Sequence, residues 1–557
     1  MDADLARTGR MPGVPSQFID QAQALIDISC RALKRRCTAN ATFEENRLDA
    51  FQSVSYAIAF CAAEIEAARQ ILAFAAAIGS NDSFATMLAE YFAADALHSV
   101  RGRLLRCPAD FGFATADTEC LAAGTPLSQA VAAHLCAASC EKLGHALLER
   151  RGRLPIAPLT DEHSMIRETF ERFAERNVAP LAEGIHRDDM DIPDEMLSAA
   201  AEIGLFAVCI PQRYGGLKPD GSEDTLSMIL VSEELSRVSL GVAGSLLTRP
   251  EIVARALLAE GTQAQQQEWL PRLATGEILA AVAVTEPNFG SDVAGVRLRA
   301  TRTAGGWLLD GQKTWCTFAG KAAVLLVLAR TDPELAKGHR GLTLFIVEKP
   351  RFPGHGFEFE GTGGGRLTGK AIPTIGYRGM HSFDLYFDSL FVPDSHVVGG
   401  TGGIGRGFYA TMQGFAGGRI QTAARATGVM LGAYERAFAY ATQRRVFGKT
   451  IAEYPLALST LVRMAALLVA CREFSHSVAK MMDRGQGQMQ ASLVKLFACR
   501  TAEWVTREAM QIHGGVGYAE ASDVSRFYVD ARVLSIFEGA EETLALKVIG
   551  RDLIRSA

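Results

Sequence analysis

Val284-Thr285-Glu286-Pro287-Asn288-Phe289-Gly290-Ser291-Asp292 is the most informative stretch of this 557-residue chain. It closes a continuous apolar run that begins at Leu279, and such a run is typical of a buried strand. The loop that follows is rich in Gly, Ser and Asp, so its backbone amides can meet a pyrimidine edge or a phosphate. The stretch therefore predicts a buried strand that opens into a ligand-binding loop.

A second stretch, Asp310-Gly311-Gln312-Lys313-Thr314-Trp315-Cys316-Thr317, lies farther along the chain. Asp310-Gly311 predicts a tight hairpin turn between strands at 307–309 and 312–317. Trp315 and Thr317 are two apart on the second strand, so we expect both side chains on one face. On this evidence alone they are also typical of an ordinary cross-strand surface pair.

The surrounding patterns predict a β domain between helical blocks. Three more apolar runs read as strands: Ala323 to Ala329, Leu342 to Val347 and Phe383 to Val392. Upstream, Thr160-Asp161-Glu162 predicts a helix start, with Thr160 as N-cap and acids in the first turn. Downstream, Arg419 to Ala437 and Leu456 to Arg472 are long segments rich in Ala and Leu. The fold class is therefore mostly α with a central β domain.

The first 150 residues differ from the rest, because they hold seven of the eleven cysteines. Glu64 to Ala77 and Val131 to Leu148 predict helices there. Gly and Pro in Arg150 to Pro155 predict a linker. We expect an N-terminal helical extension at 1–153, an α domain at 154–280, a β domain at 281–398 and a helical domain at 399–557. The extension serves assembly, a substrate lid or a structural buttress, and we favour assembly.

Composition excludes several classes of protein. Hydrophobic residues make up 48% and charged residues 21%, which is ordinary globular usage. A net charge of -5 gives no reason to expect nucleic acid or an anionic membrane as a partner. Met1-Asp2-Ala3-Asp4 shows no secretory signal, and Phe60 to Gly79 is too charged for a membrane span. The odd number of cysteines and their irregular spacing predict a reducing, cytoplasmic location.

Three patterns suggest chemistry that the sequence does not support. Gly364 to Lys370 matches a phosphate loop, but Ala371 replaces the metal-binding hydroxyl, so we interpret it as a flexible Gly-rich loop. Gly514 to Gly517 follows the end of a helix, whereas a dinucleotide fingerprint follows a strand. His134, Cys136 and Cys140 lack a second ligand pair, and His and Cys two apart point to different sides of a helix. No metal site is expected.

Five segments in order resemble the acyl-CoA dehydrogenase family. Besides the two stretches above, they are Arg444-Arg445-Val446-Phe447-Gly448-Lys449, Gln511-Ile512-His513-Gly514-Gly515-Val516-Gly517 and Ile536-Phe537-Glu538-Gly539. No single segment is decisive, but the order is specific, and the resemblance covers roughly residues 158 to 557. It implies a helical domain, a β-barrel-like domain and a four-helix-bundle domain. It also implies FAD as cofactor and dehydrogenation of an acyl-CoA ester.

The resemblance implies roles for individual residues. Thr317 would hydrogen-bond the flavin near N5, Trp315 would shield the ring, and Ser291 would lie beside both the flavin and the substrate thioester. Another group would reach the FAD of a neighbouring subunit, which requires at least a dimer: Arg444, Phe447, Gln511 and Gly515. The expected cofactor-binding residues are Val282, Val284, Thr285, Ser291, Trp315, Thr317, Arg444, Phe447, Gln511, Gly515 and Glu542.

Glu538 is the expected catalytic base. Without the resemblance it reads equally well as a solvated glutamate in a Gly turn. The chemistry needs a carboxylate beside an apolar pocket, and Ile536 and Phe537 supply apolar cover. By resemblance, Glu538 removes the α-proton while the β-hydrogen leaves as hydride to flavin N5. The Glu538 backbone amide and an FAD ribityl hydroxyl would polarise the thioester carbonyl. Some relatives place the base near Arg419, but this chain has Gly418 there, which cannot act as a base.

Four positions depart from the family pattern. Ala416 stands where many relatives have an acid that contacts coenzyme A, and Ala540 stands where many have Thr. Glu542 and Pro455 stand where glutamines often contact FAD. These departures leave the individual contacts open, but not FAD binding as a whole.

The expected substrate is a short, branched, dicarboxylic acyl-CoA. Gln52 to Phe74 and Gly376 to Met380 are among the stretches that resemble a branch of the family acting on such esters. The far carboxylate needs a buried cation, and an arginine fork in Ser245 to Pro250 is the candidate. Taken alone, that arginine is also typical of a surface or interface position. The expected substrate-binding residues are Ser291, Arg249, Phe415, Arg419 and Gly539.

Other functions stay open at this point. The substrate can be a short or branched monocarboxylic acyl group, on coenzyme A or on a carrier. An acyl-CoA oxidase and a non-catalytic flavin or DNA-binding family member are further alternatives. Besides acyl-CoA, the resemblance implies an electron-transfer flavoprotein as partner and a homo-oligomer, either dimer or tetramer.

Overall fold

The computed structural model describes residue 14, residues 16–79 and residues 82–557. Within these residues the chain forms two compact units. We call Asp161–Val429 the central unit, and Met1–Thr160 together with Met430–Ala557 the terminal unit. Met1 to Asp4, where the sequence shows no secretory signal, lie outside the residues that the structure describes.

Helices precede and follow the sheet of the central unit. They are α7 Asp161–Phe173, α8 Ala179–Arg187, α9 Asp194–Glu202, α10 Thr225–Val238, α11 Thr248–Glu260, α12 Gln263–Ala274, α13 Gly407–Gly414 and the first part of α14 Gly418–Gln443. The start of α7 is as predicted, directly after Thr160, with Asp161 and Glu162 in its first turn. Thr262 and Gln265 form a capping box that fixes the start of α12.

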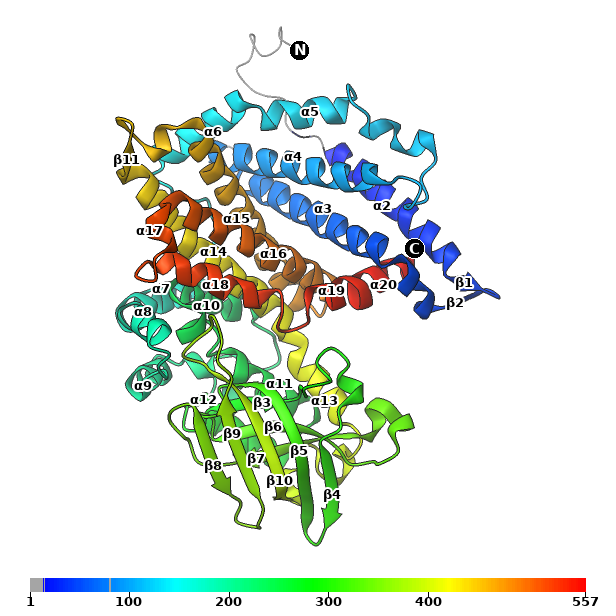
Figure 1. The fold of residues 1–557 in the computed structure, drawn as a ribbon, viewed down its shortest axis with the longest axis vertical. Coiled ribbons are helices and arrows are strands. Elements are labelled where there is room, and N and C mark those ends of the chain that lie inside the picture. Colours follow the sequence, from blue (N-terminus) through cyan, green and yellow to red (C-terminus); the bar gives the residue numbers. More distant parts are fainter. Residues whose placement is uncertain (1–13, 15, 80–81) are drawn as a thin grey trace. The chain divides into compact units, whose positions relative to one another are not determined.

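The eight-stranded sheet of the central unit follows α12 and precedes α13 in the chain (Figure 1). Its strands are β3 Ala280–Ala283, β4 Arg299–Thr303, β5 Gly306–Thr317, β6 Val324–Arg330, β7 Leu342–Glu348, β8 Gly356–Glu360, β9 Arg366–Ala371 and β10 Ser382–Pro393. The strand order is β3-β6-β4-β5-β10-β9-β8, and β7 pairs with β6. The mostly α fold with a central β domain is thus confirmed.

Both faces of β6 are buried, which explains its unbroken apolar sequence. Leu326 and Leu328 pack into a core shared with residues of α11 and α12. Leu325 and Val327 point to the other face, where the core is made by residues of the sheet itself. Alternate side chains of a strand face opposite sides, so two cores require apolar residues at every position.

The predicted Asp310-Gly311 hairpin turn is wrong, because β5 runs straight through it. Asp310 instead accepts hydrogen bonds from the backbone amide and hydroxyl of Ser389, where β10 bulges opposite it. The turn lies earlier, where Gly305 at φ 74° closes the two-residue loop between β4 and β5. The prediction of a flexible loop at Gly364 to Lys370 is also wrong in part, since strand β9 occupies the second half of this segment.

The terminal unit is helical. Its helices are α2 Ser16–Arg36, α3 Gln52–Ile78, α4 Ser83–Arg106, α5 Pro126–Leu135, α6 Ala137–Glu149, the rest of α14, α15 Pro455–Met482, α16 Gln488–His513, α17 Gly515–Tyr518, α18 Asp523–Leu534, α19 Glu541–Thr543 and α20 Arg551–Ser556. Two short ribbons complete it: β1 Thr38–Ala39 with β2 Thr42–Phe43, and β11 Arg445–Val446 with β12 Lys449–Thr450.

The N-terminal helices share one core with the C-terminal helices. In Figure 1, α3 and α4 lie alongside α15 and α16, and Phe92 of α4 meets Phe497 of α16 edge to face. A continuous helix over 131–148 is not formed, because Cys136 has extended backbone that separates α5 from α6. All eleven cysteines are among the described residues, and all are free thiols.

Helix α15 is long and apolar enough to cross a membrane by length and composition, with a window of mean hydropathy 1.5. Two thirds of that window, 67%, is buried within the chain. It packs against α3, α4, α6 and α16, as the core helix of a bundle does. Burial against protein therefore accounts for its composition.

Candidate flavin and acyl-CoA site

A buried ion pair joins the two stretches that the sequence singled out. Lys313 Nζ lies 2.8 Å from the Glu286 carboxylate and donates to the Val284 carbonyl at 3.0 Å. The other hydrogen bonds of Glu286 come from the backbone amides of Arg297 and Leu298, both at 2.7 Å. The Glu286 carboxylate therefore holds the end of β3, the following loop and β5 together.

Burial and ion pairing have opposite effects on the pKa of Lys313. Burial lowers the pKa of the Lys313 ammonium, while the charge and hydrogen bond of Glu286 act to raise it. A backbone hydrogen bond of 2.9 Å from Thr314 to the Thr285 carbonyl runs beside the pair. Sequence reasoning did not single out Glu286 or Lys313, although each lies within a quoted motif.

Replacing Lys313 with Met is expected to destabilise the central unit by about 3–5 kcal/mol, because it leaves the buried Glu286 charge without its partner. Thermal unfolding should occur at lower temperature, with loss of bound flavin. The double variant Lys313→Met/Glu286→Gln should recover part of the loss, because no uncompensated charge remains. An unchanged melting temperature in Lys313→Met would contradict this account.

The end of β5 is irregular where flavin contacts were expected. Thr314 and Trp315 together oppose Asp384 of β10, so β5 bulges there. Trp315 has φ 57° and its side chain is 56% exposed, whereas Thr317 is buried and pairs with the Ser382 hydroxyl at 2.9 Å. The bulge interrupts the alternation on which the same-face prediction relied. An exposed indole on strained backbone fits the cover of a planar ring.

Glu538 lies in a tight turn of the terminal unit, between α18 and α19. It is partly buried, at φ 53°, and Gly539 follows at φ 96°. A left-handed conformation is costly for glutamate and persists only where the surroundings impose it. Lys495 of α16 provides one such constraint, because its buried Nζ donates to the carbonyls of Phe537 at 3.1 Å and Gly539 at 2.5 Å. Lys495 therefore holds the carbonyls of both residues that flank the expected base.

A second brace reaches the same segment from the N-terminal helices. The Tyr56 hydroxyl donates to the buried Glu541 carboxylate, three residues after Glu538. Lys547 pairs with Asp49 at 2.6 Å on the same side. These contacts favour the buttress interpretation of the extension. Neither Lys495 nor Tyr56 was identified from the sequence, because each acts on a segment distant in the chain.

The residues expected to meet a neighbouring subunit's FAD are exposed at one end of the terminal unit. Phe447 is 99% exposed, at the tip of the β11–β12 hairpin, with Gly448 beside it and both at positive φ. Tyr440 near the end of α14 stacks on His513 at the end of α16, with ring centroids 4.3 Å apart. The stacking brings together the two helix ends that precede the expected contacts. Arg444, Gln511 and Gly515 are exposed there too.

Arg249, in the first turn of α11, is buried, with 7% of its surface exposed. The surface interpretation is therefore wrong for this chain. Burial raises the pKa of the Cys316 thiol to about 12, and the charges of Lys313 and Arg249 act against that rise. The Arg249 charge thus acts on a residue that lies between Trp315 and Thr317. The preceding turn is fixed by Arg425, which donates to the Ser245 hydroxyl at 3.0 Å.

The other expected site residues lie on several elements. Val282 and Val284 lie in and just after β3, with Thr285 and the exposed Ser291 in the loop beyond. Phe415 is in the short turn before α14 and Arg419 in its first turn, both partly buried. Glu542 is exposed in α19. The expected site residues therefore lie on several separate segments within each of the two units.

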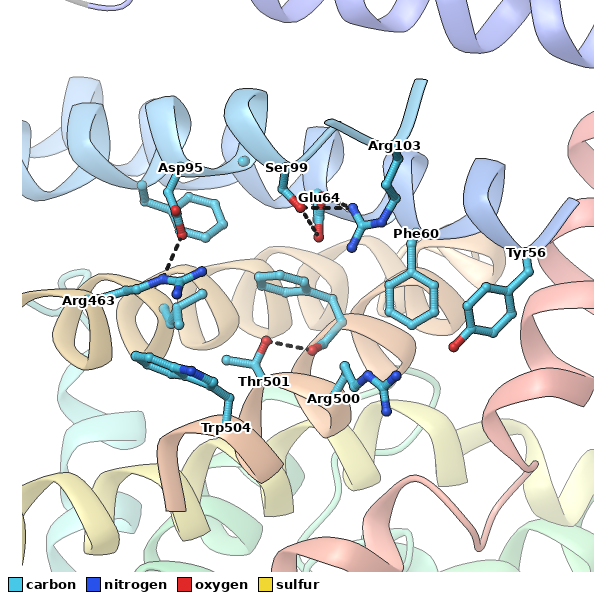
Figure 2. Close-up of a pocket in the computed structure, with 14 residues that line it drawn as sticks. Tyr56, Phe60, Glu64, Asp95, Ser99, Arg103, Arg463, Arg500, Thr501 and Trp504 are labelled. Atoms are coloured by element: carbon cyan, nitrogen blue, oxygen red, sulfur yellow. Dashed lines mark hydrogen bonds and ion pairs between the residues drawn. The ribbon is translucent and has the colours of Figure 1, made fainter. Parts of the chain in front are cut away.

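A pocket of about 350 Å³ lies between the N-terminal and C-terminal helices of the terminal unit (Figure 2). Its charges are already paired: Arg103 with Glu64 at 2.5 Å, and Arg463 with Asp95 at 3.1 Å. Arg500 faces the Glu541 carboxylate at 3.8 Å. Charged groups that satisfy one another do not converge on a ligand, so the pocket is not the catalytic site.

The glycine motif and the His–Cys motif of the sequence have the following local structures. Gly514 ends α16, as predicted, with φ 59°, and it follows a helix and not a strand. Among the described residues His134, Cys136 and Cys140 do not gather as a three-ligand cluster. The Cys136 thiol is 3.2 Å from the Ser139 hydroxyl instead.

Comparison with known proteins identifies the family. Models of the acyl-CoA dehydrogenase N-terminal, middle and C-terminal domains match residues 160–277, 281–390 and 405–554. (2S)-methylsuccinyl-CoA dehydrogenase of Cereibacter sphaeroides is 37% identical over 98% of both chains. Butyryl-CoA dehydrogenase of Megasphaera elsdenii is 31% identical with a TM-score of 0.66, over 72% of this chain and all of that one. Glutaryl-CoA dehydrogenase of Mycobacterium smegmatis, solved with FADH2, is 25% identical with a TM-score of 0.63, over 71% and 95%. The chain therefore belongs to the acyl-CoA dehydrogenase family of FAD-dependent oxidoreductases.

Proposed function

We propose that this dehydrogenase oxidises (2S)-methylsuccinyl-CoA to mesaconyl-CoA, a step of the ethylmalonyl-CoA pathway. The observation that carries the substrate is the likeness to the Cereibacter enzyme over 98% of the chain, which takes in the N-terminal helices. The butyryl-CoA dehydrogenase match spans only 72% of this chain. A short monocarboxylic acyl-CoA is the alternative substrate.

The proposed chemistry removes two hydrogens from adjacent carbons. FAD, when bound, accepts the β-hydrogen as hydride. Glu538 takes the α-proton on its carboxylate, and the electron pair left behind forms the new double bond. The left-handed turn of Glu538, held by Lys495, fixes where that carboxylate and its own backbone amide point. A positioned base of this kind contributes about 10²–10⁴-fold to rate.

Trp315, Thr317, Thr285 and Ser291 are the proposed flavin contacts of the central unit. Phe447 and Gln511 reach the FAD of a second copy, so the working enzyme is a homo-oligomer. The 99% exposure of Phe447 supports this role, since a lone chain gains nothing from an exposed phenylalanine at a hairpin tip. We further propose electron-transfer flavoprotein as the acceptor of the electrons and the cytoplasm as the location.

Arg249 is proposed to bind the distal carboxylate of the substrate. It is a buried guanidinium whose charge acts on Cys316, next to both proposed flavin contacts of β5. Arginine matches a carboxylate through two parallel hydrogen bonds. Phe415 and Arg419 are the proposed contacts of the coenzyme A portion.

Arg249→Met is expected to lower kcat/KM for (2S)-methylsuccinyl-CoA by about 100-fold, because losing one partner of a buried charge pair costs about 2–5 kcal/mol. The kcat/KM for butyryl-CoA should change by less than about 3-fold, since a butyryl chain has no distal charge. Arg172→Met, at an exposed arginine of α7, is the control and should change neither value. Equal losses with both substrates would refute the carboxylate contact without touching the dehydrogenase assignment.

The test of the proposed function is anaerobic bleaching of the bound flavin by a panel of acyl-CoA esters. Rapid bleaching by (2S)-methylsuccinyl-CoA, with slow or no bleaching by butyryl-, isobutyryl- and isovaleryl-CoA, is the expected result. Preference for one of the monocarboxylic esters would keep the reaction and replace the substrate. No bleaching by any ester, with FAD bound, would overturn the proposed reaction.

A further inference from the structure

Two histidines and two aspartates gather in the central unit, outside the residues assigned above. We call Asp189, Asp191, His355 and His381 the His–Asp cluster. They come from three segments: the turn after α8, the residue before β8 and the residue before β10. One ligand atom from each of Asp189, His355 and His381 lies within 4.8 Å of the others. Such a gathering needs three chain segments to meet at one point.

The ring nitrogens in the cluster face one another. His355 Nε2 and His381 Nε2 are 3.2 Å apart, with the rings nearly perpendicular. Asp189 Oδ1 lies 3.3 Å from His381 Nε2, and Asp189 Oδ2 lies 3.8 Å from His355 Nε2. His355 Nε2 also lies 2.9 Å from the backbone carbonyl of Asp189. The two imidazole nitrogens and the oxygens of Asp189 thus share one small volume.

Asp191 fixes which nitrogen of His381 is available. Its Oδ1 lies 3.1 Å from His381 Nδ1, while its Oδ2 accepts from the Gly354 amide at 2.5 Å. A neutral His381 that donates from Nδ1 carries a lone pair on Nε2. That lone pair then faces the Asp189 carboxylate oxygen at 3.3 Å. Two acceptors at this distance require a positive species between them.

We propose that the His–Asp cluster binds a divalent transition-metal ion of the zinc class, with Asp189, His355 and His381 as ligands. Zinc–nitrogen bonds of about 2.1 Å at a tetrahedral angle place two ligand nitrogens about 3.4 Å apart. The observed separations of 3.2 and 3.3 Å agree with that geometry. A carboxylate on the far nitrogen of a metal-bound histidine, here Asp191, is the usual orienting partner.

The surroundings leave room for a fourth ligand. His381 is buried, whereas half of the His355 side chain is exposed, so water can reach the metal position. Arg378 Nε lies 3.5 Å from Asp189 Oδ1. Its guanidinium is also held by the carbonyls of Thr374 at 3.1 Å and His186 at 2.8 Å. Arg378 Nε and His381 Nε2 therefore approach the same oxygen of Asp189.

A proton on His381 is the competing occupant. Burial lowers the pKa of His381, but the hydrogen bond to Asp191 and the charges of both aspartates outweigh burial and raise it.

A bound metal would instead tie the turn after α8 to the sheet. His381 precedes Ser382, whose hydroxyl pairs with Thr317, so the ion would brace one end of the proposed flavin strand.

The test uses full-length, untagged, FAD-loaded protein that has been treated with EDTA and dialysed free of it. We expect one Co²⁺ per chain with a micromolar or tighter Kd, and visible absorption bands of a tetrahedral site that Zn²⁺ abolishes. Zn²⁺ at 100-fold over its Kd should raise Tm, because an ion that binds only the folded state stabilises it. The absence of binding at 100 µM ion would show that the cluster holds a proton only, and would overturn the proposal.

Two variants and a control make the site assignment specific. His355→Ala should weaken Zn²⁺ at least 10-fold. Asp189→Asn should do the same without disturbing the turn, because Asn tolerates the φ of 52° found there. His145→Ala is the control, since His145 is an exposed histidine beside a single carboxylate, Glu141, and its loss should change nothing. Unchanged affinity in Asp189→Asn with native flavin absorbance would refute the site, whether or not His355→Ala folds.

Discussion

Glu538→Gln retains bound FAD and loses turnover by about a thousand-fold or more, because glutamine keeps the size of the side chain and cannot accept the α-proton. The flavin contacts proposed for the central unit do not include Glu538, so the visible spectrum of the flavin should be that of the unsubstituted enzyme. Substrate should still perturb that spectrum on binding. Reduction of the flavin under anaerobic conditions measures the chemical step directly.

The control for this prediction is Glu520→Gln, an exposed glutamate of the same unit, which should leave turnover unchanged. Circular dichroism and the flavin-to-protein absorbance ratio establish that both variants are folded and loaded. If Glu538→Gln turned over substrate at the rate of the unsubstituted enzyme, another group would have to be the base. Gly418 is the residue at the alternative family position, so that outcome would require a base from a different element.

The sequence predicted the arrangement of elements well where apolar runs are long. Leu342 to Val347 became β7 almost to the residue, and Ala323 to Ala329 became β6 with a shift of one. Such runs are reliable because both sheet faces must be filled. Strands β8 and β9 were missed, because Gly356–Glu360 and Arg366–Ala371 alternate exposed and buried positions and lie among glycines. Their pairing with β10 is a tertiary effect that short local patterns do not predict.

The candidate site likewise contains residues that a local motif predicts and residues that it does not. Glu538, Trp315 and Thr317 could be predicted as site residues because they lie in contiguous motifs. Lys495 and Tyr56 were missed because their partners are distant in sequence, and the His–Asp cluster because its members come from three segments. The predicted turn at Asp310-Gly311 was wrong for a related reason. Ser389, in the bulge of another strand, donates a hydrogen bond to the Asp310 carboxylate. Local sequence does not encode which distant groups will satisfy a buried donor or acceptor.

Lys495→Met lowers kcat by about 100-fold while FAD stays bound. The substitution keeps a long unbranched side chain in the core of α16 but removes the donor shared by Phe537 and Gly539. Loss of two hydrogen bonds, each with a charged donor, costs about 1.5–3 kcal/mol apiece, which favours relaxation of the strained turn. A displacement of about 1 Å in a positioned group is enough for a loss of this size.

Lys495 would act through Glu538, and a double-mutant cycle separates that role from simple destabilisation. In a Glu538→Gln background, Lys495→Met should cause little further loss of the residual turnover, because the base that it positions is already absent. Thr506→Val, at a buried threonine of the same helix whose hydroxyl bonds its own helix, controls for loss of stability. It should lower Tm and leave kcat within about 2-fold, since a surface or core change away from the site acts on stability alone. Additive losses of kcat in the double variant would show that Lys495 supports the fold and does not position the base. If both residues served the same proton transfer, losing Glu538 would already abolish its contribution to kcat, and losing Lys495 could not lower kcat by the same factor again.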